Sequence, residues 1–93
     1  MIDFVINEKA GGKKAVKAKK IISAVLEERN VEYAFHTTDY RKHAIEITRD
    51  LCRDGATTIV AVGGDGTINE VLNGLDDLSV NFGIIPCGSG NDF

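Results

Sequence analysis

Residues 58–62, Thr-Ile-Val-Ala-Val, constrain the fold of this 93-residue chain more than any other segment. The run is almost continuously apolar and rich in β-branched residues, a pattern typical of a strand that is covered on both faces. A glycine-rich turn, Gly63-Gly64-Asp65-Gly66-Thr67, follows it directly, and a helical pattern then extends over about 67–75. This order of elements predicts one unit of a parallel α/β sheet.

The rest of the chain repeats this alternation. Strands are predicted over 2–6, 31–37 and 80–85, and helices over 15–30 and 41–54. Strands that alternate with helices imply right-handed crossovers between parallel strands. The predicted fold class is therefore α/β with three layers: a mostly parallel sheet of about four strands with helices on both faces, in a Rossmann-like arrangement.

The two longer helices each have an apolar face. In the first we expect these side chains to point inward: Ala18, Ile21, Ile22, Val25 and Leu26. In the second we expect the same of Ala44, Ile47, Leu51 and Cys52. The second helix is expected to have Thr38 or Asp39 as its N-cap. Asn30 and Gly55 are expected to end the two helices, because both residue types tolerate left-handed backbone.

Composition fits one globular domain. Hydrophobic residues make up 43% of the chain and charged residues 27%, enough for a single folded core. The net charge of -3 excludes a global basic field, so no nucleic-acid partner is expected. Cys52 and Cys87 form neither a disulfide framework nor a zinc spacing. Since no apolar run of membrane-spanning length and no signal-peptide pattern occur, we expect a cytoplasmic protein.

The glycine-rich turn has the composition of a phosphate site. Its three glycines let backbone N–H groups approach a ligand closely, and the following helix adds unpaired N–H groups and a partial positive charge. A carboxylate beside phosphates is repelled, so Asp65 is a candidate for a role with Mg²⁺ or with a hydroxyl that accepts a phosphoryl group. The simpler alternative is a tight turn in which Asp65 or Thr67 caps the helix. Neither the dinucleotide fingerprint nor a Walker loop is present.

Two further polar loops follow predicted strands. One covers 7–14, and the other covers 86–93 and contains Ser89, whose hydroxyl can hydrogen-bond a phosphate. In a parallel sheet both loops open onto the same edge as the glycine-rich turn, where such folds bind ligands. This convergence favours a phosphate site over a simple turn. Lys13 and Lys14, taken alone, are typical of a solvated helix face.

The chain resembles the N-terminal catalytic domain of diacylglycerol kinases and the related bacterial, sphingosine and ceramide kinases. The residues that carry the resemblance are Gly63-Gly64-Asp65-Gly66-Thr67, Asn69-Glu70-Val71, Asn73-Gly74 and Gly88-Ser89-Gly90-Asn91-Asp92-Phe93. The first loop and Thr38 with His43-Ala44 match other motifs of that family. Glu8 stands where the family usually has proline, and Lys42 where it usually has glycine. Of the two histidines, His36 is predicted to be structural, and His43 to pack or cap.

The resemblance implies a kinase that uses ATP and Mg²⁺ to phosphorylate a lipid hydroxyl. The ATP-binding residues that it implies are Asn7, Glu8, Lys9, Ala10, Gly11, Thr38, Gly64, Asp65, Gly66, Thr67, Ile68, Asn69, Glu70 and Ser89. Asp65 is the candidate catalytic residue, for the metal or the acceptor hydroxyl, and no metal ligand is assigned.

By the same resemblance, residues 1–93 form the N-terminal ATP-binding domain, a fragment that lacks a β-rich domain carrying the acceptor site. Little kinase activity is expected from such a fragment alone. The expected partners are ATP, a lipid at the membrane surface and, through apolar surface left uncovered, a second copy of the chain. No amphipathic membrane anchor is evident. Two alternatives stay open: an enzyme similar to NAD kinases, which share the Gly-Gly-Asp-Gly-Thr core, or a nucleotide-binding module without catalysis.

Overall fold

The computed structural model describes residues 1–11, 13–76 and 79–87. Within them, four parallel strands form one sheet in the order β2-β1-β3-β4. The strands are β1 (Ile2–Ile6), β2 (Tyr33–Thr37), β3 (Thr58–Gly63) and β4 (Asn81–Pro86). The helices are α1 (Glu8–Gly11), α2 (Lys13–Glu28), α3 (His43–Arg53) and α4 (Asp65–Gly74). The predicted α/β fold class is confirmed.

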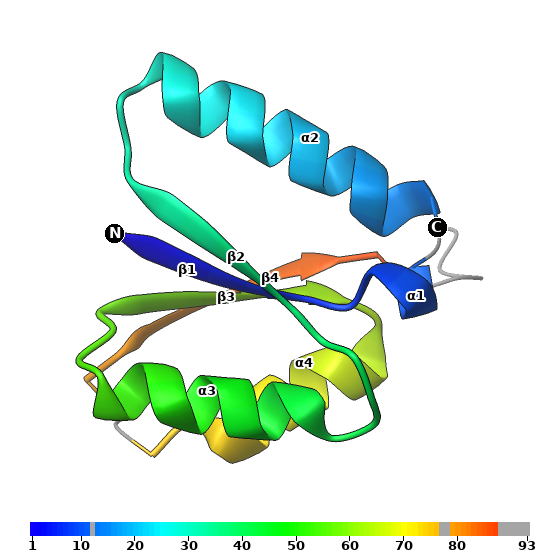
Figure 1. Ribbon diagram of the computed structural model, residues 1–93, viewed down its shortest axis with the longest axis vertical. Coiled ribbons are helices and arrows are strands. Elements are labelled where there is room, and N and C mark those ends of the chain that lie inside the picture. The colour runs from blue at the N-terminus through cyan, green and yellow to red at the C-terminus, as the bar shows by residue number, and fades with distance from the viewer. Residues whose placement is uncertain (12, 77–78, 88–93) are drawn as a thin grey trace.

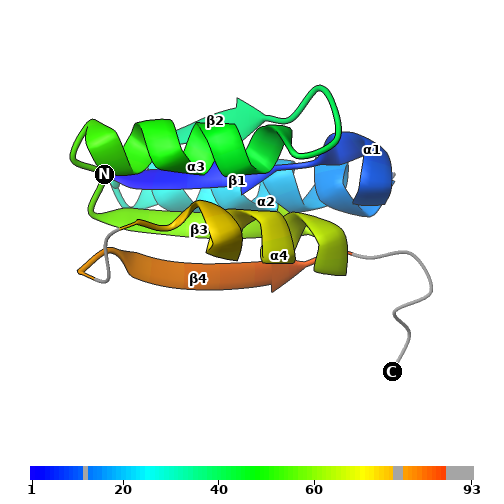
Figure 2. The same ribbon diagram turned by 90° about the horizontal axis from the view of Figure 1, so that it is seen from below.

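The sheet lies between two layers of helices, with α2 on one face and α3 and α4 on the other (Figures 1 and 2). Side chains alternate along a strand, so each central strand contributes to two cores. In β1, Phe4 and Ile6 belong to the core under α2, whereas Val5 belongs to the core under α3 and α4. In β3, Val62 belongs to the core under α2, and Ala61 belongs to the core under α3 and α4. This two-sided burial explains why β3 is apolar almost throughout.

The order of the strands creates a crevice at one sheet edge. From β1 the chain passes to β2 on one side, and it later enters β3 on the other side of β1. Ile6 at the end of β1 pairs with Thr37 and with Val62, so the carboxyl ends of the three strands lie level with one another. The connections that leave β1 and β3 therefore diverge, which makes a topological switch point.

Two helix starts differ from the sequence prediction. The first loop is not irregular, because it contains the short helix α1. The Oδ1 of Asn7, the residue before this helix, accepts a hydrogen bond from the Lys9 N–H at 3.0 Å. Helix α4 begins at Asp65 rather than at Thr67, and Gly64 is its N-cap with no capping side chain. The expectation that Asp65 or Thr67 caps this helix is therefore wrong. The positive end of the helix favours a carboxylate in the first turn, which is where Asp65 lies.

The predicted N-cap of α3 is also wrong. Neither Thr38 nor Asp39 caps this helix: Lys42 is the N-cap, in left-handed backbone with φ 69° and without a side-chain cap bond. Left-handed backbone costs a residue with a Cβ roughly 1 kcal/mol, which glycine avoids. The predicted helix ends are confirmed, since Asn30 has φ 56° and Gly55 has φ 90°.

The inward face of α2 is narrower than predicted. Ala18, Ile22 and Leu26 pack against the core under this helix, together with the fully buried Ala15. Ile21 and Val25, by contrast, are 59% and 43% exposed. A single helix on this face of the sheet turns only one stripe toward the strands, and these two side chains lie beside that stripe. In α3 the four residues predicted to point inward all do so.

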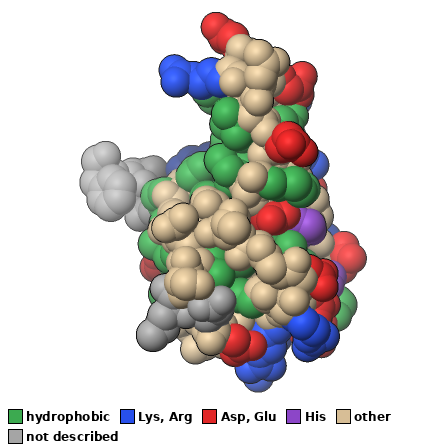
Figure 3. All heavy atoms as spheres, turned by 90° about the vertical axis from the view of Figure 1, so that its left-hand side faces the viewer, with side chains coloured by type: hydrophobic (Ala, Val, Ile, Leu, Met, Phe, Trp, Pro, Cys, Tyr) green, Lys and Arg blue, Asp and Glu red, His purple; other side chains and the backbone are tan. Residues whose placement is uncertain are grey.

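Other apolar side chains also reach the surface. On the face that Figure 3 presents, hydrophobic side chains are visible below the end of α2, where charged side chains gather. Met1, which precedes β1, and Val31, which precedes β2, are among the exposed residues. Within the described ranges no helix is both long enough and apolar enough to cross a membrane.

Helices α3 and α4 approach each other very closely at Gly74. A Cβ at this position would lie 2.7 Å from the Ile45 carbonyl oxygen and 2.8 Å from the Cβ of Thr48. Thr48 is fully buried, and its Oγ1 has no hydrogen-bond partner among the described residues. This contact fixes the position of α4 against α3, and with it the position of the first turn of α4.

The structural role predicted for His36 is confirmed. Its Nε2 lies 2.9 Å from the Oδ1 of Asp3, a carboxylate in β1 that is almost fully buried. A buried carboxylate needs such a partner, because burial of an unpaired charge is strongly unfavourable. The pair joins β1 to β2 from within the sheet.

Candidate functional site

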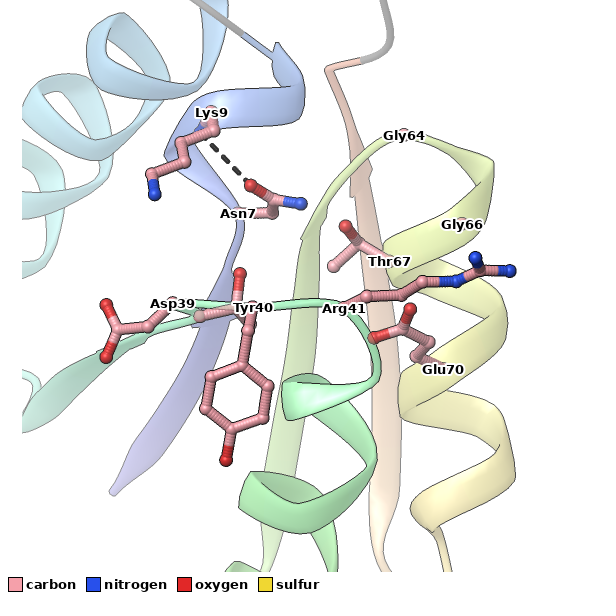
Figure 4. Close-up of a pocket in the computed structure, with 10 residues that line it drawn as sticks. Asn7, Lys9, Asp39, Tyr40, Arg41, Gly64, Gly66, Thr67 and Glu70 are labelled. Atoms are coloured by element: carbon pink, nitrogen blue, oxygen red, sulfur yellow. Dashed lines mark hydrogen bonds between the residues drawn. The ribbon is translucent and has the colours of Figure 1, made fainter.

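A cavity of about 310 Å³ lies at the switch point. Its walls come from the segments that follow β1, β2 and β3, so it opens at the carboxyl edge of the sheet. The lining residues are Asn7, Lys9, Thr38, Asp39, Tyr40, Arg41, Gly64, Gly66, Thr67 and Glu70 (Figure 4). The volume is that of a small-molecule site, and the location is where open α/β sheets bind their ligands.

The first turn of α4 supplies one wall with backbone donors that have no partner among the described residues. The first hydrogen bond within this helix runs from the Ile68 N–H to the Gly64 carbonyl oxygen at 3.1 Å. The N–H groups of Asp65, Gly66 and Thr67 therefore have no partner within the helix, and no side chain caps them. Unpaired N–H groups at the positive end of a helix favour binding of an anion.

Gly63 and Gly66 serve different purposes in this wall. A Cβ at Gly63 would lie 2.9 Å from both the Cβ and the Oγ1 of Thr67, a side chain that is almost completely buried. Glycine at position 63 is therefore needed for the turn to close. A Cβ at Gly66 would meet nothing within 4 Å, and Gly66 lines the cavity. Glycine at position 66 instead leaves space for a ligand.

The opposite wall is the loop after β2, which is held in place by His43. The Asp39 N–H donates to the His43 Nδ1 at 2.9 Å. The Tyr40 and His43 rings stack with their centroids 4.1 Å apart and their planes 12° apart. The Tyr40 hydroxyl also donates to Glu46, and this hydrogen bond raises the pKa of the phenol above its ordinary value. His43 thus packs and holds the loop, as predicted.

The cavity has charged side chains of both signs. Lys9 and Arg41 are its cations, and Asp39 and Glu70 are its carboxylates. In Figure 4 the Arg41 side chain extends from the loop after β2 toward the first turn of α4, above Glu70. A guanidinium in this position suits a phosphate, which it can bind with two parallel hydrogen bonds.

Metal binding by protein side chains alone finds no support in the described part of the chain. No group of three or more His, Cys, Asp and Glu residues there is placed to hold a metal ion. The carboxylates of Asp39 and Glu70 could each contribute one oxygen ligand. A divalent cation in this cavity would therefore need most of its ligands from a bound phosphate and from water, as Mg²⁺ commonly does in phosphate-transferring enzymes.

The sequence-predicted binding residues fall into two groups. Seven line the cavity: Asn7, Lys9, Thr38, Gly64, Gly66, Thr67 and Glu70. Among the others, Asp65 and Asn69 are exposed outside its wall, and Ile68 packs against the core under α3 and α4. Ala10 and Gly11 belong to α1, and Ser89 lies outside the described residues.

Glu8, the remaining predicted residue, also lies outside the wall. Its carboxylate is 3.7 Å from the Lys19 Nζ of α2. Its charge therefore acts on α2 rather than on the contents of the cavity. The residues that sequence reasoning missed are Asp39, Tyr40 and Arg41, all in the loop after β2.

Together, the fold and the cavity define an α/β domain with a candidate ligand site beside a glycine-rich turn at a switch point. Residues 2–93 match the diacylglycerol kinase catalytic domain, and the chain belongs to this family. The family that the sequence motifs indicated is thereby confirmed. The match also favours lipid kinases over the NAD-kinase-like alternative.

Known relatives agree with this assignment. Diacylglycerol kinase of Bacillus subtilis (strain 168) is 39% identical over 80 residues, which cover 81% of this chain and 26% of that protein. Sphingosine kinase 1 of Arabidopsis thaliana is 36% identical over 92 residues, covering 87% of this chain and 19% of that protein. A solved structure of "a putative diacylglycerol kinase from Bacillus anthracis str. Sterne" has a TM-score of 0.74 at 27% identity, covering 99% of this chain and 32% of that one. The chain thus spans less than a third of the length of these proteins.

Proposed function

We propose that the chain binds ATP with Mg²⁺ in the switch-point cavity and is the N-terminal nucleotide-binding domain of a lipid kinase. The observation that carries this proposal is the pairing of two anion-binding features across one cavity. Unpaired N–H groups at the first turn of α4 form one wall, and Arg41 extends toward them from the other. A polyphosphate between the two would be neutralised from both sides.

The side chains of the cavity suggest a division of roles around the nucleotide. Gly66 leaves space for a phosphate at the N–H groups of α4, and Lys9 adds a second positive charge beside Asn7. Mg²⁺ would bind the phosphates, with Asp39 or Glu70 as a protein ligand. It would neutralise charge during transfer of the phosphoryl group. Asp65 is proposed to contact the metal or the acceptor hydroxyl from outside the cavity wall.

The proposed reaction is transfer of the γ-phosphoryl group of ATP to the hydroxyl of a lipid. Its catalysis would rest on positioning and charge neutralisation, the usual means of phosphoryl transfer. The two relatives named above are a diacylglycerol kinase and a sphingosine kinase, so the acceptor of this chain is proposed only as a lipid hydroxyl. We further propose that the acceptor site needs residues outside 1–93 and that these residues alone transfer little phosphate.

The proposed location follows from the proposed reaction. A cytoplasmic enzyme that uses ATP would meet its lipid at the membrane surface, as a peripheral protein.

Self-association is proposed through apolar side chains that the described residues leave uncovered. Leu72 on α4 and Ile84 on the edge strand β4 are examples, at 47% and 48% exposure.

The decisive experiment is NMR shift mapping of the chain with ATP and Mg²⁺. We expect signals of residues 38–41 and 64–67 to move, and Arg41→Gln to weaken binding about 10- to 100-fold through loss of a charge-assisted hydrogen bond. Arg49→Gln is the matched control, because Arg49 is exposed on α3 and lies outside the cavity. Absence of any shift in 63–70 would overturn the proposal. Equal affinity of both variants would exclude Arg41 from the site.

A further inference from the structure

Tyr40 differs from the other aromatic residues that the structure describes. It is 56% exposed, whereas Phe4, Tyr33, Phe35 and Phe82 are buried or half-buried. Among the described residues it is also the one aromatic residue that lines the switch-point cavity. The phosphate contacts proposed above make no use of its ring. An exposed aromatic ring beside a ligand cavity is available to bind a part of the ligand that the phosphate contacts leave free.

The Tyr40 ring is held in one orientation from one side. Its stacking on the His43 ring, with centroids 4.1 Å apart and planes 12° apart, covers one face. Its hydroxyl donates to Glu46 in α3, which fixes the ring at its far end. No second ring among the described residues lies against the other face. A ring that is already fixed loses little conformational entropy when a flat ligand stacks on it.

The position of Tyr40 suits the part of a nucleotide that is farthest from α4. Arg41, the next residue, extends toward the first turn of α4, where we propose that the phosphates bind (Figure 4). The Tyr40 ring projects from the same loop on the side away from Gly64 and Gly66 (Figure 4). A cavity of about 310 Å³ is small for a ligand site, so a whole nucleotide extends beyond the space that its phosphates fill. Along this loop, the next group that it meets after Arg41 is Tyr40.

The charges around Tyr40 suit an uncharged base better than a phosphate. The hydrogen bond to Glu46 raises the pKa of the Tyr40 phenol, and the negative charges of Glu46 and Asp39 add to this rise. The same charges repel phosphate from this side of the loop. A neutral base is not repelled, and it can stack on an aromatic ring without any hydrogen bond to its edge.

We propose that the open face of Tyr40 stacks on the base of the nucleotide and gives the cavity a preference for purines. A purine has two fused rings and covers more of the tyrosine than a pyrimidine does. The inference rests on the proposed function, because it needs the phosphates at the first turn of α4. It adds a residue that selects the base, at a position that belongs to none of the sequence motifs described above.

The test compares three ligands that carry the same chain of phosphates. Isothermal titration with Mg²⁺ measures the affinity of the 93-residue chain for ATP, CTP and inorganic tripolyphosphate. Stacking of a base on an aromatic side chain corresponds to about 5- to 100-fold in affinity. We therefore expect ATP to bind more tightly than tripolyphosphate by about this factor, and CTP to lie between them.

Two variants separate the ring from the loop that carries it. Tyr40→Ala should lose the preference for ATP and keep the wild-type affinity for tripolyphosphate. Tyr40→Phe is the matched control, because it keeps the ring and loses only the hydrogen bond to Glu46. It should keep most of the affinity for ATP. Circular dichroism should show both variants folded, since Tyr40 lies outside the two cores.

A third variant reports the stacking directly. The chain contains no tryptophan, so Tyr40→Trp places a single indole at this position. Stacking of adenine on the indole should quench its fluorescence when ATP is added. Tripolyphosphate should bind this variant without such quenching, because it has no base.

Several results would overturn the inference. Equal affinity for ATP and tripolyphosphate would show that no base is bound, and equal affinity for ATP and CTP would exclude the purine preference. Equal losses of ATP and tripolyphosphate in Tyr40→Ala would mean that the ring only holds the loop. Unquenched indole, or the same loss in Tyr40→Phe as in Tyr40→Ala, would also contradict stacking.

The same ligands separate this inference from the proposed function. Binding of tripolyphosphate without a preference for ATP would end the inference about Tyr40 and leave the phosphate site at α4 intact. Absence of binding of all three ligands would overturn the proposed function, and the inference with it.

Discussion

Gly66→Ala should raise the thermal stability of the chain and lower its affinity for ATP. Gly66 is the second residue of α4 and lines the cavity, and a Cβ built there meets nothing within 4 Å. The added methyl group therefore strains no neighbour. It enters the space in front of N–H groups that we propose hold a phosphate.

The expected magnitudes follow from these two facts. Alanine stabilises a helix relative to glycine, here by about 0.5 kcal/mol, because the unfolded chain has less conformational freedom to lose. In a domain of this size that corresponds to a rise in Tm of roughly 2–4 °C. Displacement of the phosphate from a charge-assisted hydrogen bond removes about 1.5–3 kcal/mol, or about 10- to 100-fold in ATP affinity.

Thermal unfolding followed by circular dichroism measures the first effect, and isothermal titration with ATP and Mg²⁺ measures the second. Asn73→Ala is the control, since Asn73 is exposed on the same helix and lies outside the cavity. A Gly66→Ala variant that binds ATP like the wild type would refute the placement of phosphate at α4. A variant that fails to fold would refute the reasoning about free space at this position.

Two further substitutions test the local backbone. Gly74→Ala should destabilise the chain by about 1–3 kcal/mol, because its Cβ would lie 2.7 Å from the Ile45 carbonyl oxygen. A lower urea midpoint at unchanged m-value would show this, and an unchanged midpoint would mean that α3 and α4 separate easily. Lys42→Gly should stabilise by up to about 1 kcal/mol, because it relieves left-handed backbone at φ 69°. Lys42→Ala keeps the Cβ and should leave Tm unchanged, so equal Tm values for both variants would contradict the argument.

Much of the fold could be predicted because its main determinants are local. The apolar run of β3 needs burial on both faces, and Asn30 and Gly55 mark helix ends by their own backbone preferences. The inward face of α2 could not be predicted fully. Periodicity gives the spacing of apolar side chains, but the width of the surface that a helix meets depends on its neighbours. Ile21 and Val25 therefore fit the pattern and still lie outside the core.

The cavity residues, too, could be predicted only in part. Gly64, Gly66 and Thr67 could be predicted because strand, turn and helix are contiguous in sequence. Tyr40 and Arg41 belong to no motif that reasoning from residues could use. They reach the cavity because β2 lies beside β1, so that the loop after β2 faces the first turn of α4. Strand order is a property of the whole sheet, and no short stretch of sequence reveals it.

The position of Asp65 explains how a carboxylate can occur in a turn that we propose binds phosphate. A carboxylate within a phosphate cradle would repel its ligand, yet Asp65 stands in the middle of the glycine-rich turn. It lies in the first turn of α4, exposed and outside the cavity wall, where the positive end of the helix favours its charge. The backbone of the turn can therefore line the cavity while the Asp65 carboxylate lies outside its wall. A role for Asp65 then requires a second reactant, the metal or the acceptor hydroxyl, to approach from outside the wall.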